Sequence, residues 1–461
     1  MHYTRRLLDR RGSAAFVVAF AAVGAVAVAC SAEDSVIGDL DDTPDAGSDV
    51  TDVPFDAGEP EIVVRDSAPP PFDGGPLPVS CTSSPCATQL VTTRGAVLAD
   101  RAEGFCALLQ DGTVTCWGAD NAAQLGRGAD GGIGDSAKAE RVAGLTGIVS
   151  IDHNCALDDG GDAYCWGTGP FLQNAMAATT TERTPVKLPL PAAKKIALGV
   201  ATGCALTKDG RVLCWGSNVN GQISPFESKP SSAVMPPTEM TMPPGAPIRD
   251  LVVGDAAFAV REDGTFVTWG ANPPLARISP LFPDPYPVAS VLSDVTTIDV
   301  ADHNACTTTG GIGYCWGAVF PRVIDPSITG PRLERALPAP VVAPEPLVQI
   351  ATTRAVILSR VGVVQTVQPQ RWCACAASGA VYCRGYNESG QAGDGTKNHA
   401  YDAVKVVGLP APAAEVRTTP DASCALLTNG KVFCWGANFY GQLGNGKIKA
   451  ASVVPQEVVM P

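Results

Sequence analysis

Short stretches in which apolar and polar residues alternate recur along this chain, and in seven places two of them flank a tight-turn sequence. Alternation with a period of two residues predicts half-buried β-strands, and Asp-Gly or Asn-Gly between two such strands predicts a hairpin. The pattern is clearest in Cys204–Gly216 and Cys424–Gly436, and each copy ends in Trp-Gly or a variant of it. The tryptophan positions of successive copies are 49, 49, 54, 47, 68 and 51 residues apart: Trp117, Trp166, Trp215, Trp269, Trp316, Arg384 and Trp435.

Further strand-like segments precede each hairpin. An apolar strand such as Lys195–Leu198 or Ile248–Val253 comes first, and a Pro-Val segment such as Pro185–Leu188 comes before that strand. Four short strands in a unit of this length indicate a β-propeller blade rather than a helical solenoid. The few helix signals, together with 48 Gly and 39 Pro, agree with an all-β chain.

The two ends of the repeat region predict how the ring closes. The chain finishes with Val453–Pro461, which has the Pro-Val character of a segment that begins a unit. The first copy, starting near Ala96, has no clear Pro-Val segment of its own. We therefore expect the C-terminal strand to complete the first blade.

Paired cysteines bracket six of the seven hairpins, and the fourth copy has lost both together, with Phe258 and Thr268 in their places. A three-residue loop at Lys208–Gly210 places Cys204 opposite Cys214. In the fifth copy the cysteines are one residue closer, and a two-residue Gly-Gly turn compensates. Directly opposed Cβ atoms lie about 4.5–5.5 Å apart, close to the range of a disulfide. We predict bridges within the hairpins and a small clip ahead of them: Cys106–Cys116, Cys155–Cys165, Cys204–Cys214, Cys306–Cys315, Cys373–Cys383, Cys424–Cys434 and Cys81–Cys86.

Two other uses of these cysteines stay open at this point. They could be reduced, buried pairs that pack as small apolar residues, or they could bind zinc, although each hairpin offers only two thiolates. No metal or cofactor is predicted. Of the 16 cysteines, the seven pairs and Cys30 leave Cys375, which falls at the apolar position that Leu206 and Leu426 hold in their copies and is expected to be a buried free thiol.

The N-terminal 29 residues predict an export signal. Four arginines precede an uncharged apolar stretch, Ala14–Ala29, which is short for a membrane-spanning helix. Val26–Ser31 resembles the bacterial lipobox, which implies lipid attachment at Cys30, while ordinary cleavage after Ala29 is the alternative. Export of either kind reaches an oxidising compartment, which the paired cysteines require. We expect a lipoprotein of the bacterial cell envelope, in the outer membrane, because Ser31 is not the Asp associated with inner-membrane retention.

Residues 30–80 have the composition of a tether. Ser31–Ser80 carries 13 acidic residues and one basic residue, Arg65, so most of the chain's net charge of −13 lies here. Such a Pro- and Gly-rich segment is expected to be a disordered, self-repelling spacer. Its carboxylates lack the spacing of a calcium-binding EF-hand loop. The expected domains are therefore a signal peptide at 1–29, a tether at 30–80 and a propeller at 81–461.

The residues that follow the hairpins carry a family resemblance. Asn438–Gly446, directly after Cys434-Trp435-Gly436, resembles the regulator-of-chromosome-condensation repeat, and Ala122–Gly128, Asn218–Gln222 and Asn387–Gly393 match its tail in part. The tails of copies two, four and five depart from it. The resemblance covers roughly residues 88 to 461 and implies a seven-bladed propeller. Eukaryotic members act on a small GTPase, and similar exported bacterial propellers bind and inhibit other proteins.

Motifs that carry chemistry are absent from the sequence. No Gly-x-Ser-x-Gly elbow, phosphate loop or His-Glu-x-x-His motif occurs, so no catalytic residue is predicted. Asp158-Asp159 and Glu262-Asp263 lie at hairpin turns, where Asp is favoured for local backbone bonding. His153 and His303 precede hairpin cysteines and are expected to be framework residues, whereas His399 is expected to be solvated. The lack of a basic run argues against nucleic acid as a partner.

The leading hypothesis is a non-catalytic protein, attached to the membrane only through its lipid, whose propeller loops bind a partner protein at the cell envelope. The longest loops are expected at Ser224–Pro247, Asn272–Val288 and Pro321–Pro346. An enzyme acting on a polysaccharide in the central channel is the second hypothesis, and carboxylates with an aromatic side chain lining the channel would favour it. A carbohydrate-binding adhesin is the third. The recurring tryptophans are expected to pack in the core rather than to bind a ligand.

Overall fold

The computed structural model of this chain describes residues 72, 74–82, 84–95, 103–226, 233–317, 335–361 and 364–461. The chain divides into two compact units, Met1–Asp66 and Ser67–Pro461, and everything below concerns the second. The expected signal peptide, Cys30 and most of the expected tether lie outside the described residues. Among the residues described, no helix is long and apolar enough to cross a membrane.

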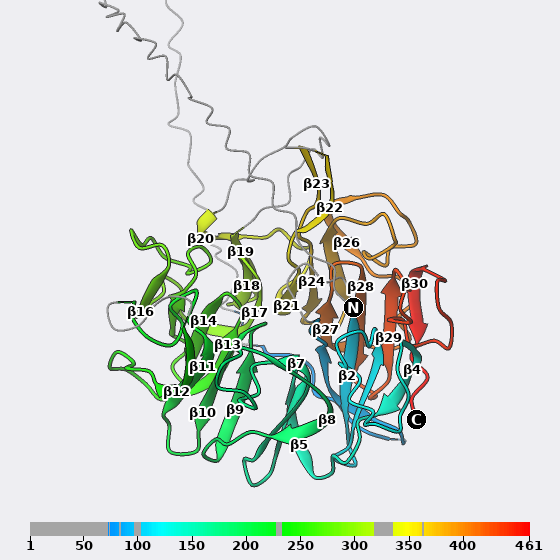
Figure 1. The fold of residues 1–461 in the computed structure, drawn as a ribbon. Helices are drawn as coiled ribbons and strands as arrows, with labels where there is room; N and C mark the ends of the chain where they lie inside the picture. The colour runs from blue at the N-terminus through cyan, green and yellow to red at the C-terminus, as the bar shows by residue number, and fades with distance from the viewer. Residues whose placement is uncertain are drawn as a thin grey trace, which may run out of the picture. The chain divides into compact units, whose positions relative to one another are not determined.

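The described part of the chain is an all-β, seven-bladed propeller built from four-stranded antiparallel sheets, blades 1 to 7 in chain order (Figure 1). Blades 1 to 3 consist of β1 (Ala87–Thr92), β2 (Gly104–Leu109), β3 (Val114–Gly118) and β4 (Ser136–Arg141); β5 (Ile148–Asp152), β6 (Cys155–Asp158), β7 (Ala163–Gly169) and β8 (Thr180–Lys187); and β9 (Ala193–Leu198), β10 (Thr202–Thr207), β11 (Val212–Ser217) and β12 (Val234–Glu239).

Blades 4 to 7 repeat this arrangement, with one insertion in blade 6. They consist of β13 (Ile248–Val253), β14 (Ala256–Arg261), β15 (Phe266–Gly270) and β16 (Asp284–Ala289); β17 (Val295–Ala301), β18 (Asn304–Thr309), β19 (Ile312–Gly317) and β20 (Arg335–Pro340); β21 (Leu347–Thr352), β24 (Trp372–Ala376), β25 (Val381–Gly385) and β26 (Ala400–Lys405); and β27 (Ala413–Thr418), β28 (Ala422–Leu427), β29 (Val432–Gly436) and β30 (Ser452–Glu457).

The insertion in blade 6 is a separate two-stranded hairpin, β22 (Val356–Val361) and β23 (Val364–Gln368). It lies between the first and second strands of the blade and accounts for the long 68-residue spacing of the repeat. The sequence interpretation did not identify it.

The hairpin register follows from the turn lengths, as predicted. Cys204 pairs with Cys214 across β10 and β11, and Gly210 adopts φ of 89°, a left-handed conformation that favours glycine. Cys306 pairs with Cys315 in blade 5 because its two-residue turn is shorter by one residue. In blade 4 Phe258 faces Thr268 at the corresponding positions.

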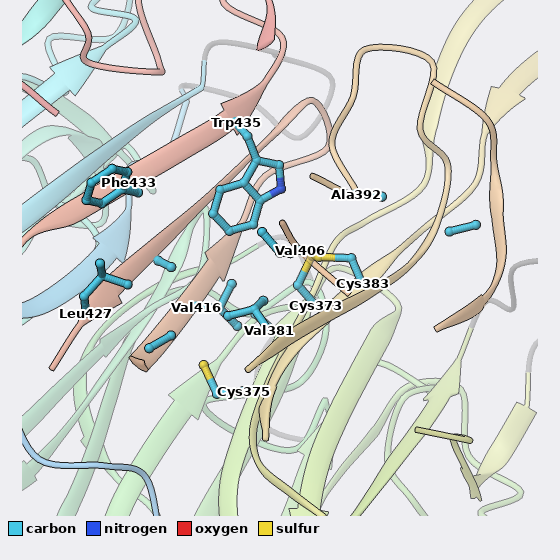
Figure 2. Close-up of a cluster of buried hydrophobic side chains, with 14 of the residues drawn as sticks. Cys373, Cys375, Val381, Cys383, Ala392, Val406, Val416, Leu427, Phe433 and Trp435 are labelled. Atoms are coloured by element: carbon cyan, nitrogen blue, oxygen red, sulfur yellow. A yellow bond between two sulfur atoms is a disulfide. The ribbon is translucent and has the colours of Figure 1, made fainter. Parts of the chain in front are cut away.

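All seven predicted cysteine pairs are bonded in the structure. The six hairpin bridges join Cα atoms 4.0–4.1 Å apart, and the Cys81–Cys86 clip joins Cα atoms 5.8 Å apart. Cys375 is the free cysteine of the described residues and lies buried in the core between blades 6 and 7, near the Cys373–Cys383 bridge (Figure 2). Burial raises the pKa of its thiol, so it stays protonated and unreactive.

The prediction for the C-terminal strand is wrong. β30 pairs with β29 and is the outer strand of blade 7, not a part of blade 1. Blade 1 has its own outer strand, β4, paired with β3. The Pro-Val segment therefore ends each blade rather than beginning the next, as Val186 opposite Cys165 in blade 2 illustrates. The physical reason is that a short tail after Trp-Gly returns the chain antiparallel to the strand it has just left.

Tryptophans at the end of six of the seven hairpins join neighbouring blades. Six indole rings are almost completely buried, which agrees with a packing role. Each donates its Nε1–H to a backbone oxygen in the tail of the preceding blade, in the pairs Trp117–Gln442, Trp166–Gln124, Trp215–Pro170, Trp269–Gln222, Trp316–Pro274 and Trp435–Gln391. The Trp117 bond joins blade 7 to blade 1, whose red and blue strands lie side by side in Figure 1, and so helps to close the ring.

The last residues before blade 1 lie along the hairpin turns of three blades. We call this end of each blade the turn end, and the opposite end, where the third strand leads into the fourth, the tail end. A Cβ on Gly311 of blade 5 would lie 3.0 Å from Phe72, and one on Gly379 of blade 6 would lie 2.9 Å from Leu77. Ser80 donates its N–H to the Thr428 oxygen of blade 7 at 2.7 Å. This segment, residues 72 and 74–82, is therefore a strap on the turn end of blades 5 to 7.

Candidate functional site

The central channel holds a cavity of about 200 Å³ to which the innermost strands of all seven blades contribute. Its lining contains carboxylates from Asp152, Asp250 and Asp299 and cations from Lys195 and Arg417. The residues described as lining it include no Phe, Tyr or Trp. The polysaccharide-acting enzyme considered above would have both carboxylates and an aromatic side chain in the channel. The lining has the carboxylates but not the aromatic side chain.

Most of these polar side chains serve the backbone of the next blade. The innermost strand of each sheet is an edge strand, so half of its N–H and C=O groups need partners outside its own sheet. Asp152 accepts a hydrogen bond from Leu198 N at 2.9 Å, and Asp299 accepts one from Thr352 N at 2.7 Å. Three further side chains bond the next inner strand in the same way, at distances of 2.8–3.0 Å: Gln89 to Ile151, Gln349 to Val416 and Glu415 to Leu90.

Cations complete the links between blades. Lys195 of blade 3 lies 3.0 Å from Asp250 of blade 4, and Arg249 donates to the Val295 oxygen of blade 5 at 2.6 Å. With the five bonds above, each of the seven boundaries between blades has a polar link between its inner strands. Burial alone would lower the pKa of Lys195, but Asp250 and Asp152 raise it, so the ammonium stays charged. These groups are committed to holding the ring together.

His153 is a fixed, neutral member of this network. Its Nδ1 lies 2.8 Å from the backbone carbonyl oxygen of Thr92, which can only accept, so Nδ1 carries the proton. Its Nε2 therefore accepts from the Arg94 guanidinium, also at 2.8 Å. Burial, and secondly the charge of Arg94, lowers the pKa of His153 to about 4. The histidine is a framework residue, as expected from the sequence.

Two further acidic residues, Asp255 and Asp302, lie close together at the tail end of the channel. Burial, and secondly Asp255, raises the pKa of Asp302 to about 6. The His303 Nε2 lies 3.8 Å from Asp255, and more than half of this imidazole is exposed. His303 thus does not repeat the contacts of His153. Within the described ranges no group of three or more His, Cys, Asp or Glu residues could hold a metal ion.

Two smaller expectations have different outcomes. His399 is not solvated as expected: its ring lies 5.0 Å from that of Tyr386, its Nδ1 accepts from Asn387 N, and burial lowers its pKa. The acidic residues at hairpin turns do bond local backbone, since Asp158 accepts from Asp162 N at 2.8 Å and Asp263 accepts from Thr265 N at 3.0 Å.

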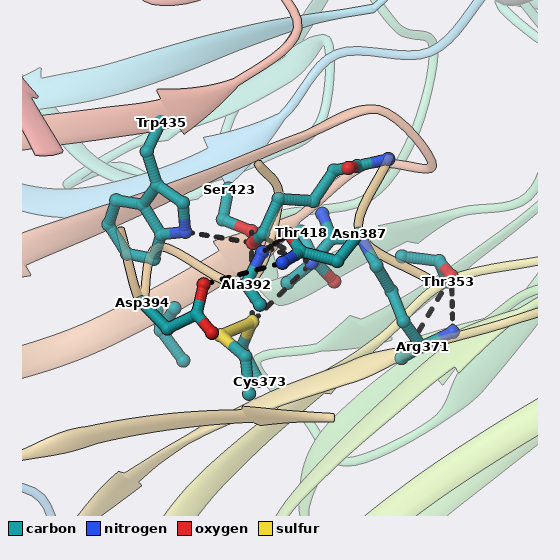
Figure 3. The surroundings of a disulfide bond; sticks show 12 residues. Thr353, Arg371, Cys373, Asn387, Ala392, Asp394, Thr418, Ser423 and Trp435 are labelled. Carbon is teal, nitrogen blue, oxygen red and sulfur yellow. Dashed lines mark hydrogen bonds between the residues drawn. A yellow bond between two sulfur atoms is a disulfide. The ribbon is translucent and has the colours of Figure 1, made fainter. Parts of the chain in front are cut away.

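A buried arginine that the sequence interpretation missed joins blades 6 and 7. Arg371 is 2 % exposed and donates to Ser423 Oγ at 2.8 Å and to the Thr419 oxygen at 2.7 Å, beside the Cys373–Cys383 bridge and Trp435 (Figure 3). Burial lowers its pKa to about 10, which leaves it charged at neutral pH. These acceptors lie about 50 residues away, in β28 and in the loop before it, and no local sequence signal marks them.

The predicted binding loops are partly strands. Ser224–Pro247 contains β12, Asn272–Val288 contains most of β16, and Pro321–Pro346 contains β20. Each is the outer strand of its blade, and the proline-rich composition that indicated a loop instead belongs to an edge strand, where proline is tolerated. The second of these segments nevertheless exposes a group of large apolar side chains that we call the blade-4 rim: Ile278, Leu281, Phe282, Tyr286 and Val288.

A buried ion pair holds the blade-4 rim, in the blade that lacks a hairpin disulfide. Arg277 lies 2.7 Å from Asp284, and both side chains are less than a tenth exposed. Arg277 also donates to the hydroxyl of Thr268, which stands at a cysteine position in the other blades. Burial alone would raise the pKa of Asp284, but hydrogen bonds from Ser279 and Arg277 lower it. Thr268, which replaces the cysteine, thus supplies a hydrogen-bond acceptor for Arg277.

The sequence and the fold both resemble known proteins. The sequence model of the regulator of chromosome condensation (RCC1) repeat matches residues 193–222 and 420–442. Among solved structures, yeast RCC1 (Prp20) bound to Kap60 matches with a TM-score of 0.59 and 18% identity over 75% of this chain and 83% of that chain. Human WBSCR16 matches with a TM-score of 0.55 and 16% identity over 76% of this chain and 94% of that chain. The chain therefore carries repeats of this type on a propeller of the same fold.

Proposed function

We propose that this protein is an exported, lipid-anchored and non-catalytic propeller that binds a partner protein at the bacterial cell envelope. One observation supports the non-catalytic part: the inner-strand side chains Asp152, Asp299, Glu415 and Lys195 are engaged in links between blades. A general acid or nucleophile needs a group that is free to meet a substrate.

Similar propellers support protein binding as the class of function. Yeast RCC1 (Prp20) is bound to Kap60 in one solved structure, and Prp20p binds Gsp1p and histones. The exported chain proposed here would meet a partner of the cell envelope instead. What carries over is the use of a rigid propeller to present surface loops, which is how function is commonly built on such scaffolds.

The lipid anchor is supported by the lipobox-like Val26–Ser31 and by the disulfides, which persist in oxidising compartments.

Two measurements on intact native cells test the proposal. Metabolic labelling with an alkyne-bearing palmitate should label the wild-type chain but not Cys30→Ala, and loss of the anchor should release the variant from membranes. Crosslinking of the wild-type chain should then attach a discrete envelope protein. Labelling that persists in C30A would refute the anchor, and crosslinking that yields only glycans or the chain itself would refute the partner.

A further inference from the structure

The outer strands of the seven blades differ in one position that the register makes comparable. On the third strand of each blade, one residue comes directly before the second hairpin cysteine, or before Thr268 in blade 4. We compare the residues that pair with this position from the outer strand. In five blades the pairing residue is an exposed charge: Arg141, Lys187, Glu239, Lys405 and Glu457. In blade 4 it is Ala289 and in blade 5 it is Pro340. Charged side chains on an edge strand discourage association with other surfaces, so blades 4 and 5 lack this protection.

Blade 4 goes further, because its whole outer rim lacks exposed charge. From Ile278 to Ser293 the sequence has one residue that is charged at neutral pH, Asp284, and it is buried against Arg277. Ile278 and Phe282 are 78% and 76% exposed, and Leu281, Tyr286 and Val288 are each exposed by about two fifths. Tyr286 and Val288 are two residues apart on β16 and therefore point to the same side. An uncharged apolar strip of this kind is typical of an interaction site.

The rim is ordered before any partner arrives. Beyond the Arg277–Asp284 pair, Asn272 donates to the Ser279 and Leu281 oxygens at 3.1 and 2.9 Å, and Ser279 donates to Asp284 at 2.7 Å. These bonds fix the backbone on both sides of Phe282. A preorganised surface loses little entropy on binding.

The backbone of β16 excludes strand addition as the binding mode. Pro285 and Pro287 have no N–H, the N–H of Tyr286 is bonded to Asp284, and the Tyr286 oxygen accepts from Arg277. Pairing of β16 with the same strand of a second copy would require those groups to be free. A membrane surface is disfavoured as well, because no Lys or Arg lies between Ile278 and Ser293 to contact anionic lipids.

We propose that the blade-4 rim is the docking site for the envelope partner, and that it inserts Phe282 and Ile278 into an uncharged apolar groove of that protein. This inference rests on the proposed function and deepens it. We expect the groove to be uncharged because the rim carries no exposed charge. A charged group on the partner would lose its water against the rim and would find no opposite charge there.

Photo-crosslinking in intact native cells tests this site. p-Benzoylphenylalanine is placed at Phe282 or, as a matched control, at Phe439, which is an aromatic residue 56% exposed in the tail of blade 7. We expect one protein adduct from position 282, at least a tenfold weaker adduct from position 439, and loss of the first adduct when Ile278→Asp is added. The added substitution lies on the exposed surface, and an unchanged thermal midpoint checks that the fold is intact.

Each other outcome overturns the docking site. Equal adducts from both positions, or an adduct that survives I278D, would mean that the rim is not the site. An adduct with lipid, or one of twice the chain's mass, would mean that a membrane or a second copy covers it. If Phe439 gave the only partner adduct, the proposed function would stand and the docking site would fail. If no position gave a partner adduct, both would fail.

Discussion

At the scale of single residues, the channel uses side chains associated with catalysis as framework. Asp152 and Asp299 replace hydrogen bonds that an edge strand lacks, and His153 is held neutral between Thr92 and Arg94. The pKa of His153 is lowered to about 4, compared with an ordinary value near 6.5. The folded state therefore binds this proton more weakly than the unfolded state. The contribution of His153 to stability is complete above pH of about 6.5 and is lost as the pH falls towards 4.

We expect His153→Asn to remove this pH dependence, which amounts to as much as about 3 kcal/mol between pH 6.5 and 4. Asn tolerates the φ of 46° found at this position. Asp302 acts in the opposite direction, because its raised pKa makes the folded state bind a proton as the pH falls below about 6. The test is therefore the difference between wild type and variant in urea unfolding across this pH range. His303→Asn, at an exposed histidine, is the control, and a difference that does not change with pH would contradict the assignment.

The Arg277–Asp284 pair gives a second prediction at this scale. Arg277→Ala leaves a carboxylate buried without its partner, so we expect the free energy of unfolding to fall by about 3–5 kcal/mol. A double substitution, Arg277→Met with Asp284→Leu, should recover part of the loss because no charge is left buried. Arg211→Ala, which removes an exposed pair with Asp209, should have no measurable effect. Equal free energies of unfolding for R277A and R211A, measured in urea, would contradict the role given to the Arg277–Asp284 pair.

At the scale of elements, the sequence predicts what local geometry determines. Turn length and alternation set the register of each hairpin, so the opposition of Cys204 and Cys214, and of Cys306 and Cys315, could be counted from the sequence. A periodic pattern does not reveal which strand begins a unit, and this is why β30 was assigned to the wrong blade. The bonds of Arg371 join residues about 50 positions apart in the sequence and leave no local pattern.

Deletion of the residues after Ala451 tests the corrected assignment. The deletion removes β30 from blade 7 and also the Val459 oxygen, which accepts from Ala139 N of blade 1 at 3.1 Å. We expect the thermal midpoint to fall by several degrees, with blade 7 losing amide protection in hydrogen exchange before blade 1. Protection lost first and selectively in blade 1 would support the original assignment, and an unchanged midpoint would contradict both.

At the scale of the whole molecule, most of the net charge lies in a segment that precedes the propeller. Thirteen acidic residues and one basic residue lie in Ser31–Ser80, while the blades are joined by buried indoles, internal disulfides and channel hydrogen bonds. The blade without a disulfide is also the blade with an uncharged outer rim. A rigid ring that exposes one uncharged edge is suited to the presentation of a binding surface. The lack of charge on this edge could be recognised from the sequence only after the outer strands had been located.

Peptide mapping of the unreduced native protein tests the central claim most directly. If the chain is an exported ring whose blades are bridged internally, digestion will yield seven bridges, each within one hairpin or the Cys81–Cys86 clip, and a single thiol at Cys375 that reacts only after unfolding. Bridges that connect different blades, or free thiols at the hairpin positions, would contradict it.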